Sequence, residues 1–343
     1  MTTCAITMTA LNDLAVITLT GSDATTFLQA QLTQDMAALG PDKAALAGYC
    51  TARGRLFASM VAVQQGDTDA DGWLLITKAD AALAFGQRLR MFVLRAKVDI
   101  EISETGVIGV RHCAPVPDAA GTTHGTATDA HTPAITVAGA PVSADTLTVP
   151  DAAPAYSVVR QNGQIWISVP QRDNAPEQRW WVLNADTAIT PDDAANQAWQ
   201  ADDIAAGLPW IQAATQEAFI PQTVNMDLIG GVSFTKGCYP GQEVVARSHY
   251  RGTIKRRMAY ARTEGFDGVD VHALPGADTF DANQPGRPSG RVVNAAINSG
   301  TLHVLMEVQL ADLDTAAYRL GDENGPAVTV VSLPYSITPQ ANS

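Results

Sequence analysis

The alternation of apolar and polar positions predicts strands and helices in turn over the first hundred residues. The run Leu14–Thr20 is mostly apolar and stops at Gly21, as strands commonly do. Helical spacing follows in Ala24–Leu32, where Ser22 or Asp23 is placed to cap the helix. The pattern then predicts two hairpin strands within residues 47–63 and another strand at 73–77. A helix over 80–94 and a last strand over 96–102 follow. This order is typical of an α+β sandwich.

The rest of the chain divides into a second mixed region and a run of short strands. Apolar runs predict strands at 107–111, around Trp166 and at 180–183. Residues 115–155 are rich in Ala, Thr, Gly and Pro, which indicates a surface loop or a flexible insertion. A helix is expected over Asp192–Ala206, ending at Gly207, and short strands after Arg257 predict a small antiparallel barrel. We therefore expect three regions, residues 1–105, 106–250 and 251–343.

The composition limits the class of protein and its partners. The 343 residues are 46% hydrophobic and 17% charged, which excludes a mostly disordered chain. Lys and Arg total 22 against 35 Asp and Glu, a net charge of −13, so we expect neither nucleic acid nor a membrane as partner. The start lacks the pattern of a secretory signal, and a cytoplasmic protein with free thiols is expected from the scattered cysteines Cys4, Cys50, Cys113 and Cys238.

Two groups of residues have only weak site character. A zinc site would need ligands at closer spacing than the sequence offers in His112, Cys113, His124 and His131. Arg53-Gly-Arg55 has the composition of an anion clamp on a turn, but exposed arginines are common in hairpins. No phosphate-binding glycine loop or hydrolase nucleophile motif is present.

One segment has stronger chemical character. Residues 236–257 place Cys238 just before a predicted helix that begins near Pro240 and ends by Gly252. The partial positive charge of the helix end, together with Lys236, favours a thiolate there. The same segment holds six Lys or Arg residues and one acid, Glu243, so the local charge is opposite to that of the whole chain. The alternative is that Cys238 is a small buried hydrophobe.

The same residues carry a family resemblance. The run K-G-C-Y-P-G-Q-E at 236–243 resembles the signature of the YgfZ family, folate-binding proteins of iron–sulfur cluster maintenance that are related to the glycine-cleavage T-protein. Further similar segments are 27–35, 48–55, 204–209, 219–225, 230–234, 289–292 and 333–337. The resemblance covers most of the chain and is weakest over 106–190.

This resemblance implies an α+β fold of three domains in a ring. Two ferredoxin-like domains would be intertwined in sequence, the third would be a C-terminal antiparallel β-barrel, and tetrahydrofolate or a derivative would bind near the central opening. Trp199 stands where the family has a tryptophan that could stack on the folate, whereas a second tryptophan of some relatives is Leu14 here. One wall of the pocket therefore differs, and we expect weaker folate binding.

The resemblance also supplies the candidate site residues. The functional thiol is Cys238 with Lys236 as its stabilising cation, and the folate-binding set comprises Leu14, Trp199, Gln222, Asn225, Tyr239, Gln242, Glu243, Arg247 and Arg251. We expect Glu243 to bind helix-end or loop amides, or simply to cap the helix. Arg247, Arg251 and the run 255–257 would hold the folate glutamate tail or an acidic partner, the alternative being a solvated helix face.

The function implied is that of an accessory protein for iron–sulfur enzymes. Its partners would be folate and iron–sulfur assembly factors or client enzymes, with Cys238 acting as a transient thiolate and no permanently bound metal, since a cluster needs about four ligands. The alternative is a folate-dependent aminomethyltransferase. T-proteins carry an acidic residue just after the turn that is Gly54 here, whereas Arg55–Ser59 has no carboxylate. That difference and the presence of Cys238 favour the accessory function.

Overall fold

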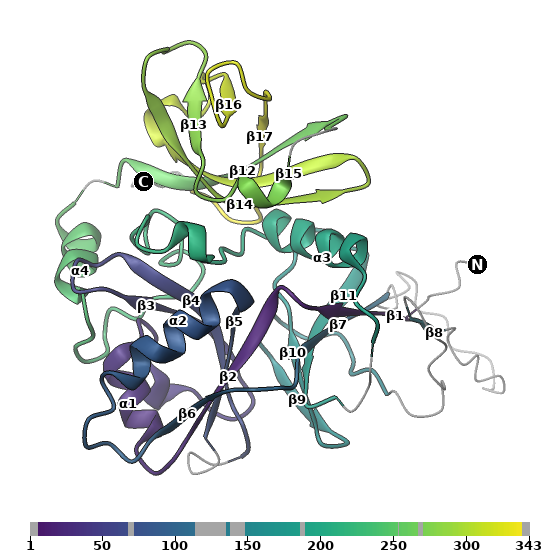
Figure 1. Ribbon diagram of the computed structural model, residues 1–343, viewed down its shortest axis with the longest axis vertical. Coiled ribbons are helices and arrows are strands. Elements are labelled where there is room, and N and C mark those ends of the chain that lie inside the picture. Colours follow the sequence, from purple (N-terminus) through teal and green to yellow (C-terminus); the bar gives the residue numbers. More distant parts are fainter. Residues whose placement is uncertain are drawn as a thin grey trace, which may run out of the picture.

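The computed structural model describes residues 6–67, 72–113, 135–137, 148–185, 189–252, 254–266 and 270–337. In these residues the chain forms three β-sheets of five or six strands with four α-helices around them (Figure 1). His124 and His131 of the weak metal candidate lie outside the described residues. No helix in the described part of the chain is long and apolar enough to cross a membrane.

The first sheet is antiparallel and confirms the strand and helix order predicted for the N-terminal region. Its strands, in spatial order, are β3 (Ala45–Cys50), β4 (Leu56–Gln64), β5 (Trp73–Lys78), β2 (Leu14–Thr20) and β6 (Asp99–Ile102). The helices α1 (Ala24–Gln31) and α2 (Ala79–Arg90) bury apolar side chains such as Leu28 and Phe85 against one face, in a cluster that also contains Ile17 and Leu75 of the sheet. The opposite face packs toward the rest of the molecule through residues such as Val16 and Val61.

Two local expectations for this region were wrong. Neither Ser22 nor Asp23 caps α1 through its side chain. Asp23 instead accepts a hydrogen bond from the amide of Lys97 at 2.8 Å, which ties the start of the helix to the strand segment before β6. The second helix ends at Arg90 rather than near Leu94, and Leu94 lies in the left-handed region with φ 47°.

The second sheet joins the beginning of the described chain to its middle. Its strand order is β8 (Ile135–Val137), β1 (Ile6–Leu11), β7 (Val107–Cys113), β11 (Glu177–Leu183), β10 (Gln164–Ser168) and β9 (Val158–Gln161). Strand β1 pairs antiparallel with β7 from Thr7 opposite Arg111 to Leu11 opposite Val107. The first strand of the described chain therefore lies outside the first sheet, although β2 follows it directly.

The helix α3 (Asp193–Ala205) begins and ends where the sequence predicts. Asp192 Oδ1 accepts hydrogen bonds from the amides of Ala194 at 2.9 Å and Ala195 at 3.1 Å. Gly207 follows with φ 70°, a conformation that glycine adopts without strain. The helix packs against β14 (Pro288–Asn298) and β15 (Thr301–Gln309) of the third sheet and also contacts β1 (Figure 1).

The third sheet confirms the expected short antiparallel strands. Its order is β16 (Tyr318–Leu320), β13 (Asp278–Asp281), β14 (Pro288–Asn298), β15 (Thr301–Gln309), β12 (Arg256–Glu264) and β17 (Thr329–Val331). The sheet curls into a half-barrel at one end of the molecule (Figure 1). Its edges are linked by the hydrogen bonds from Val328 N to Tyr318 O and from Leu320 N to Pro326 O, both 3.1 Å.

The largest cluster of buried side chains is shared by all three sheets. It includes Val61 of the first sheet, Trp181 of the second and Val293 of the third. Trp210, in the segment between α3 and α4 (Gln242–Tyr250), meets Trp181 edge to face with ring centroids 6.1 Å apart. The sheets are therefore packed around one apolar centre, and the segment 206–241 passes between them.

Candidate functional site

The predicted thiol motif and the 51–55 hairpin turn meet in direct backbone contact. Gly241, the residue before α4, has φ 79°, and Gly54 in the turn has φ 70°. A Cβ atom on Gly241 would lie 2.3 Å from the carbonyl oxygen of Thr51, and one on Gly54 would lie 2.6 Å from Cβ of Val244. Both positions thus require glycine, for conformation and for space. The two segments that the sequence singled out separately form one rigid corner.

Lys236 lies inside this corner and faces the end of helix α1. Its ammonium donates hydrogen bonds to the carbonyl oxygens of Gln29, Leu32 (2.6 Å) and Gln34 (3.1 Å). A cation at the C-terminus of a helix is stabilised by the helix dipole. Burial lowers the pKa of Lys236 to about 8, against the attraction of Asp35, which raises it. These three acceptors direct the Lys236 ammonium to the end of α1, and its stabilisation of a Cys238 thiolate stays a prediction.

Cys238 is exposed, whereas Cys50 is fully buried. Burial raises the pKa of the Cys50 thiol to about 12, so Cys50 stays protonated and unreactive. Between Lys236 and Cys238, Gly237 has open space around it, since a Cβ there would meet no atom within 4 Å. The alternative that Cys238 is a buried hydrophobe is therefore wrong. No group of three or more possible metal ligands occurs among the described residues.

The neighbouring Tyr239 points inward. Its side chain is buried, and burial raises the pKa of its hydroxyl. The Lys236 ammonium lies 5.2 Å from the centre of its ring, within reach of a cation–π interaction. Pro240 and Gly241 then lead into α4, which begins at Gln242. The chain thus exposes Cys238 by anchoring the residues on both sides of it.

Gln222 and Asn225 are fully buried and hold the corner to the third sheet. Gln222 Nε2 donates to the carbonyl oxygen of Val245 in α4 at 2.7 Å. Asn225, with φ 62°, donates through Nδ2 to Met258 O at 2.7 Å and accepts from Met258 N at 3.3 Å. The amide donors of these two residues are used within the protein, whereas Gln222 Oε1 is buried and accepts no hydrogen bond from the described residues, so direct folate contact by them stays a prediction.

The remaining predicted residues of this segment lie on the outer side of α4. Gln242 is half-buried at the first turn, whereas Glu243, Arg247 and Arg251 are exposed. None of the capping hydrogen bonds expected of Glu243 is formed at the helix start, where the cap residue is Gly241.

The expectation for the last arginine of the run 255–257 was wrong. Arg257 is buried and forms a two-pronged ion pair with Asp227, at 2.5 Å and 3.0 Å, so it is not available to a folate tail. Its Nη1 also donates to the carbonyl oxygen of Gln222 at 2.8 Å. Arg257 therefore serves to hold the segment before α4 against β12.

Trp199 lies away from the thiol, inside the core. Its exposed fraction of 1% leaves no ring face open to a ligand in this conformation. The guanidinium carbons of Arg111 and Arg179 lie 5.0 Å and 4.9 Å from its ring centre. A Cβ on Gly109 would lie 2.6 Å from the indole, so the strand is fitted closely to the ring. Leu14 is also buried, in the same apolar cluster as Trp199.

A polar cavity of about 350 Å³ opens beside these two residues, between the turn that joins β1 and β2, the end of β5, helix α3 and the segment around His272. It is lined by Asn12, Asp13, Lys78, Ala79, Asp80, Asp193, Asn196, Gln197, Gln200, Gln212 and His272. No pattern in the sequence indicates this site. Its residues come from five separate segments, and the sole sequence signal is that Asn12 and Asp13 precede Leu14 while Asn196 and Gln200 flank Trp199.

The cavity contains acceptor atoms without partners. Lys78, buried to 3% exposure, pairs with Asp13 Oδ2 at 2.5 Å and donates to Gln200 Oε1 at 3.3 Å. Asp13 Oδ1 and Asn196 Oδ1 are buried and accept no hydrogen bond from the described residues. Asn196 is nearly fully buried, and its Nδ2 donates to Asn12 Oδ1. An unpartnered buried acceptor is costly, so a donor-bearing ligand would be stabilised here.

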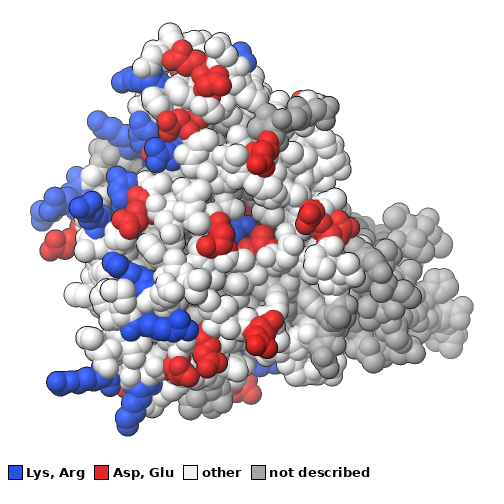
Figure 2. Space-filling view, in the orientation of Figure 1, with Lys and Arg blue, Asp and Glu red and all other residues white. Residues whose placement is uncertain are grey.

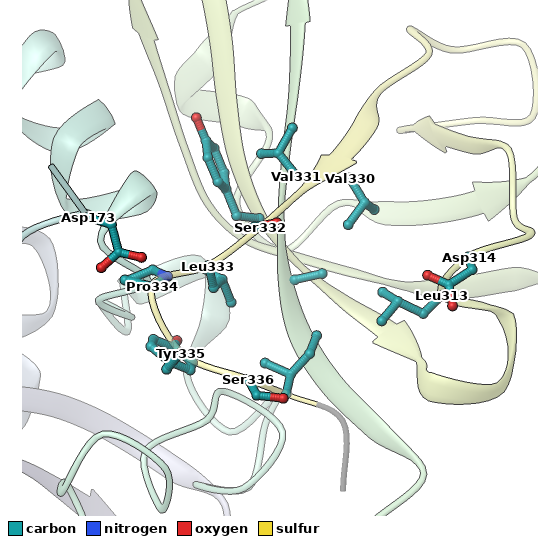
Figure 3. A pocket seen from close by; sticks show the side chains of 13 residues that line it. Asp173, Leu313, Asp314, Val330, Val331, Ser332, Leu333, Pro334, Tyr335 and Ser336 are labelled. Carbon is teal, nitrogen blue, oxygen red and sulfur yellow. The ribbon is translucent and has the colours of Figure 1, made fainter. Parts of the chain in front are cut away.

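A larger cavity of about 560 Å³ lies at the third sheet (Figure 3). Most of its lining comes from the segment Val330–Ile337, which begins in the last two residues of β17. Tyr260 and Leu313 also line it. None of the residues predicted from the sequence lines this cavity. Tyr335 of the lining, however, accepts a hydrogen bond of 3.4 Å from Asn225 Nδ2, so the cavity adjoins one of the predicted residues.

Comparison with known proteins supports the resemblance seen in the sequence. No family model matches the chain. The tRNA-modifying protein YgfZ of Cronobacter sakazakii is 29% identical over 348 residues, covering 97% of this chain and 94% of the relative. Proteins of the same name from Yersinia pseudotuberculosis and Edwardsiella ictaluri are also 29% identical, covering 97% and 98% of this chain and 93% and 94% of their own.

A solved structure shows the same fold. The glycine cleavage system aminomethyltransferase T from Bartonella henselae matches with a TM-score of 0.54 at 13% identity, over 96% of this chain and 86% of its own. At this identity the likeness concerns the fold alone. The resemblance of the chain to the YgfZ family, with a T-protein-like fold, is confirmed over nearly its whole length.

Proposed function

We propose that this protein binds tetrahydrofolate and acts as an accessory factor for iron–sulfur enzymes through the exposed thiol of Cys238. The observation that carries the proposal is the pairing of an exposed, rigidly anchored thiol with a polar cavity whose buried acceptors lack partners. The three sheets would be the three domains of a T-protein-like ring. The related proteins named tRNA-modifying suggest that the clients include cluster-dependent enzymes that modify tRNA.

The cavity suits the pterin end of a folate. A pterin ring presents a 2-amino group and ring N–H groups, which would donate to Asp13 Oδ1 and Asn196 Oδ1. The lining contains three carboxylates, those of Asp13, Asp80 and Asp193, but only one lysine and one histidine. An anionic glutamate tail would therefore be repelled. We therefore propose that the ring enters the cavity and the tail remains outside. Bound folate would supply a one-carbon carrier or a reductant there.

The thiol corner and the cavity lie at the two ends of the stretch 54–59, which includes the start of β4. The pairing of Met60 with Thr77 places Lys78, at the cavity, beside Ser59 of β4. Gly54, which contacts the thiol corner, is five residues away, or on the order of 15–20 Å at the rise of a strand. Folate bound in the cavity would thus influence the thiol through β4 and the hairpin rather than by contact.

The absence of a carboxylate in Arg55–Ser59 and the Asp13–Lys78 pair argue against the aminomethyltransferase alternative, although Asp80 and Asp193 also line the cavity. A transferase needs a carboxylate free to orient the folate nitrogen. Asp13 is within the cavity, but its charge is neutralised by Lys78 at 2.5 Å. We therefore keep transfer chemistry as the second candidate, favoured only by the fold of the structural relative.

Replacing Asn196 by an apolar residue is expected to weaken folate binding. In Asn196→Leu, an unpartnered acceptor is replaced by a bulky apolar side chain, so the affinity for tetrahydrofolate should fall by about tenfold or more. Isothermal titration calorimetry measures the affinity, and Asn298→Leu, at the end of β14, is the matched control. Thermal unfolding of both variants separates lost binding from lost folding. Wild-type affinity in a folded Asn196→Leu protein would place the folate elsewhere.

Removing the exposed thiol is expected to abolish the accessory function while leaving folate binding intact. A thiolate of Cys238 would bind an iron atom of the cluster as a transient ligand after releasing its proton to solvent. A deletion strain carrying Cys238→Ser should therefore show the reduced activity of cluster enzymes seen without any protein, whereas Cys50→Ala, which removes the buried thiol, should restore activity. Full rescue by Cys238→Ser, or one-carbon turnover that survives it, would contradict the proposal.

A further inference from the structure

A surface around helix α4 carries a dense group of cations. We call it the basic face, defined as Arg53, Arg55, Arg247, Arg251, Lys255 and Arg256. Five of these residues are exposed, and Arg256 is partly exposed. Figure 2 shows Lys and Arg gathered along the side of the molecule where Figure 1 places α4, while Asp and Glu are spread over the rest of the view. In a chain of net charge −13 this concentration is local.

The contacts of the thiol corner bring these cations together. The close approach of Gly54 to Val244 sets Arg53 and Arg55 beside the first turn of α4. Arg55 is held there by a hydrogen bond of 2.5 Å to the carbonyl oxygen of Ala218. Arg256 is held by Ser289 O at 2.8 Å. The basic face is thus built from a hairpin, a helix and the start of β12, with fixed relative positions.

Few carboxylates neutralise this face. Glu243 is exposed in the first turn of α4, and Glu307 lies 3.4 Å from Arg256. Burial raises the pKa of Glu307, while Arg256, Arg291 and Arg55 lower it, which shows that several arginines surround this one acid. At physiological salt, charges act over about 8 Å, so the local excess decides what binds.

Aromatic side chains lie at the far end of the same helix. Phe234 and His249 stack with ring centres 3.7 Å apart and an angle of 15° between their planes. Tyr250 meets both rings edge to face and is 67% exposed. An exposed tyrosine supported by two packed rings is a stacking platform, and the adjacent Arg251 supplies a cation beside it.

We propose that the basic face binds a single-stranded segment of RNA, with Tyr250 stacking on an unpaired base. Binding sites for single strands combine cations along the backbone with aromatic rings for the bases, and both occur here on one helix. An acidic peptide would use the cations but not the ring. The helix spans about 13 Å, which exceeds one phosphate group and suits two or three nucleotides. Cys238, at the other end of α4, would lie beside the bound strand.

This inference departs from the expectation that the acidic chain has no nucleic-acid partner. That expectation counted charge over the whole chain, whereas binding depends on the charge within a Debye length of the phosphates. The inference is also independent of folate binding, because the cavity and the basic face share no residue.

Fluorescence anisotropy with a labelled, unstructured RNA of about 12 nucleotides tests the proposal. Tyr250→Ala should weaken binding about tenfold, because base stacking on an aromatic ring is lost, whereas Tyr250→Phe should bind like the wild type. Arg247→Gln and Arg251→Gln should each lower the slope of log affinity against log salt by about 0.7. Arg95→Gln, an exposed arginine between α2 and β6, is the control and should leave the slope unchanged.

Two results would overturn the proposal. The first is absence of RNA binding by the wild-type protein at low salt. The second is equal competition by polyglutamate together with no effect of Tyr250→Ala, which would identify the basic face as a site for an acidic protein partner. Since Tyr250 is 67% exposed, its replacement should not impair folding, which circular dichroism can verify.

Discussion

Gly241→Ala is expected to lower the free energy of unfolding by about 2–5 kcal/mol. An alanine at φ 79° is strained, and its Cβ would lie 2.3 Å from the carbonyl oxygen of Thr51, so the helix and the hairpin must separate. The strain and the displaced backbone both act at the corner that presents Cys238. Urea unfolding measures the loss of stability, and the alkylation rate of Cys238 reports the change in local structure.

Gly237→Ala is the matched control for this prediction. Gly237 lies four residues before Gly241 in the same motif, but a Cβ there would meet no atom within 4 Å. Its replacement should change the free energy of unfolding by less than about 0.5 kcal/mol. Equal stability of the Gly241→Ala and Gly237→Ala proteins would show that the corner is not rigidly packed.

Breaking the buried ion pair between Asp227 and Arg257 is expected to cause the second large loss of stability. Asp227→Asn leaves the Arg257 guanidinium without a counter-charge at 8% exposure, which should cost about 3–5 kcal/mol. Asp278→Asn removes an exposed pair, in which Arg291 lies at 3.4 Å, and should cost no more than about 1 kcal/mol. Urea denaturation of the two variants gives the comparison.

The double variant Asp227→Leu/Arg257→Met separates charge from packing. If the cost of Asp227→Asn comes from the unpaired guanidinium, replacing both partners by apolar side chains should recover much of the stability. A double variant no more stable than the single one would instead assign the loss to packing or to the hydrogen bond from Arg257 to Gln222 O.

The sequence predicts the helices well where local chemistry determines them. Helix α3 begins after its capping Asp192 and stops before Gly207, within one residue of the prediction at each end. Helix α4 begins two residues after Pro240. The failed cap at Ser22 and Asp23 has a tertiary cause, because Asp23 binds the amide of Lys97, 74 residues away.

The candidate site is predicted only in part, because its geometry depends on long-range contacts. The sequence motif identifies Cys238, but the direction of the Lys236 side chain depends on where α1 ends in space. Similarly, Asp13, Lys78 and Asn196 have no common pattern along the chain and meet only through the packing of α3 against the sheets. Residue type alone also cannot distinguish the buried Arg257 from the exposed Arg251.

The pairing of β1 with β7 has a consequence for how the chain is synthesised. Residues 6–11 leave the ribosome about a hundred residues before their partner strand 107–113. All five strands of the first sheet lie between β1 and β7 in the sequence, so that sheet can form before β7 is made. The β1 segment, with Ile6, Met8 and Leu11 destined for burial, must therefore wait unpaired during translation. Nascent chains arrested before residue 107 would be the ones that need protection by chaperones.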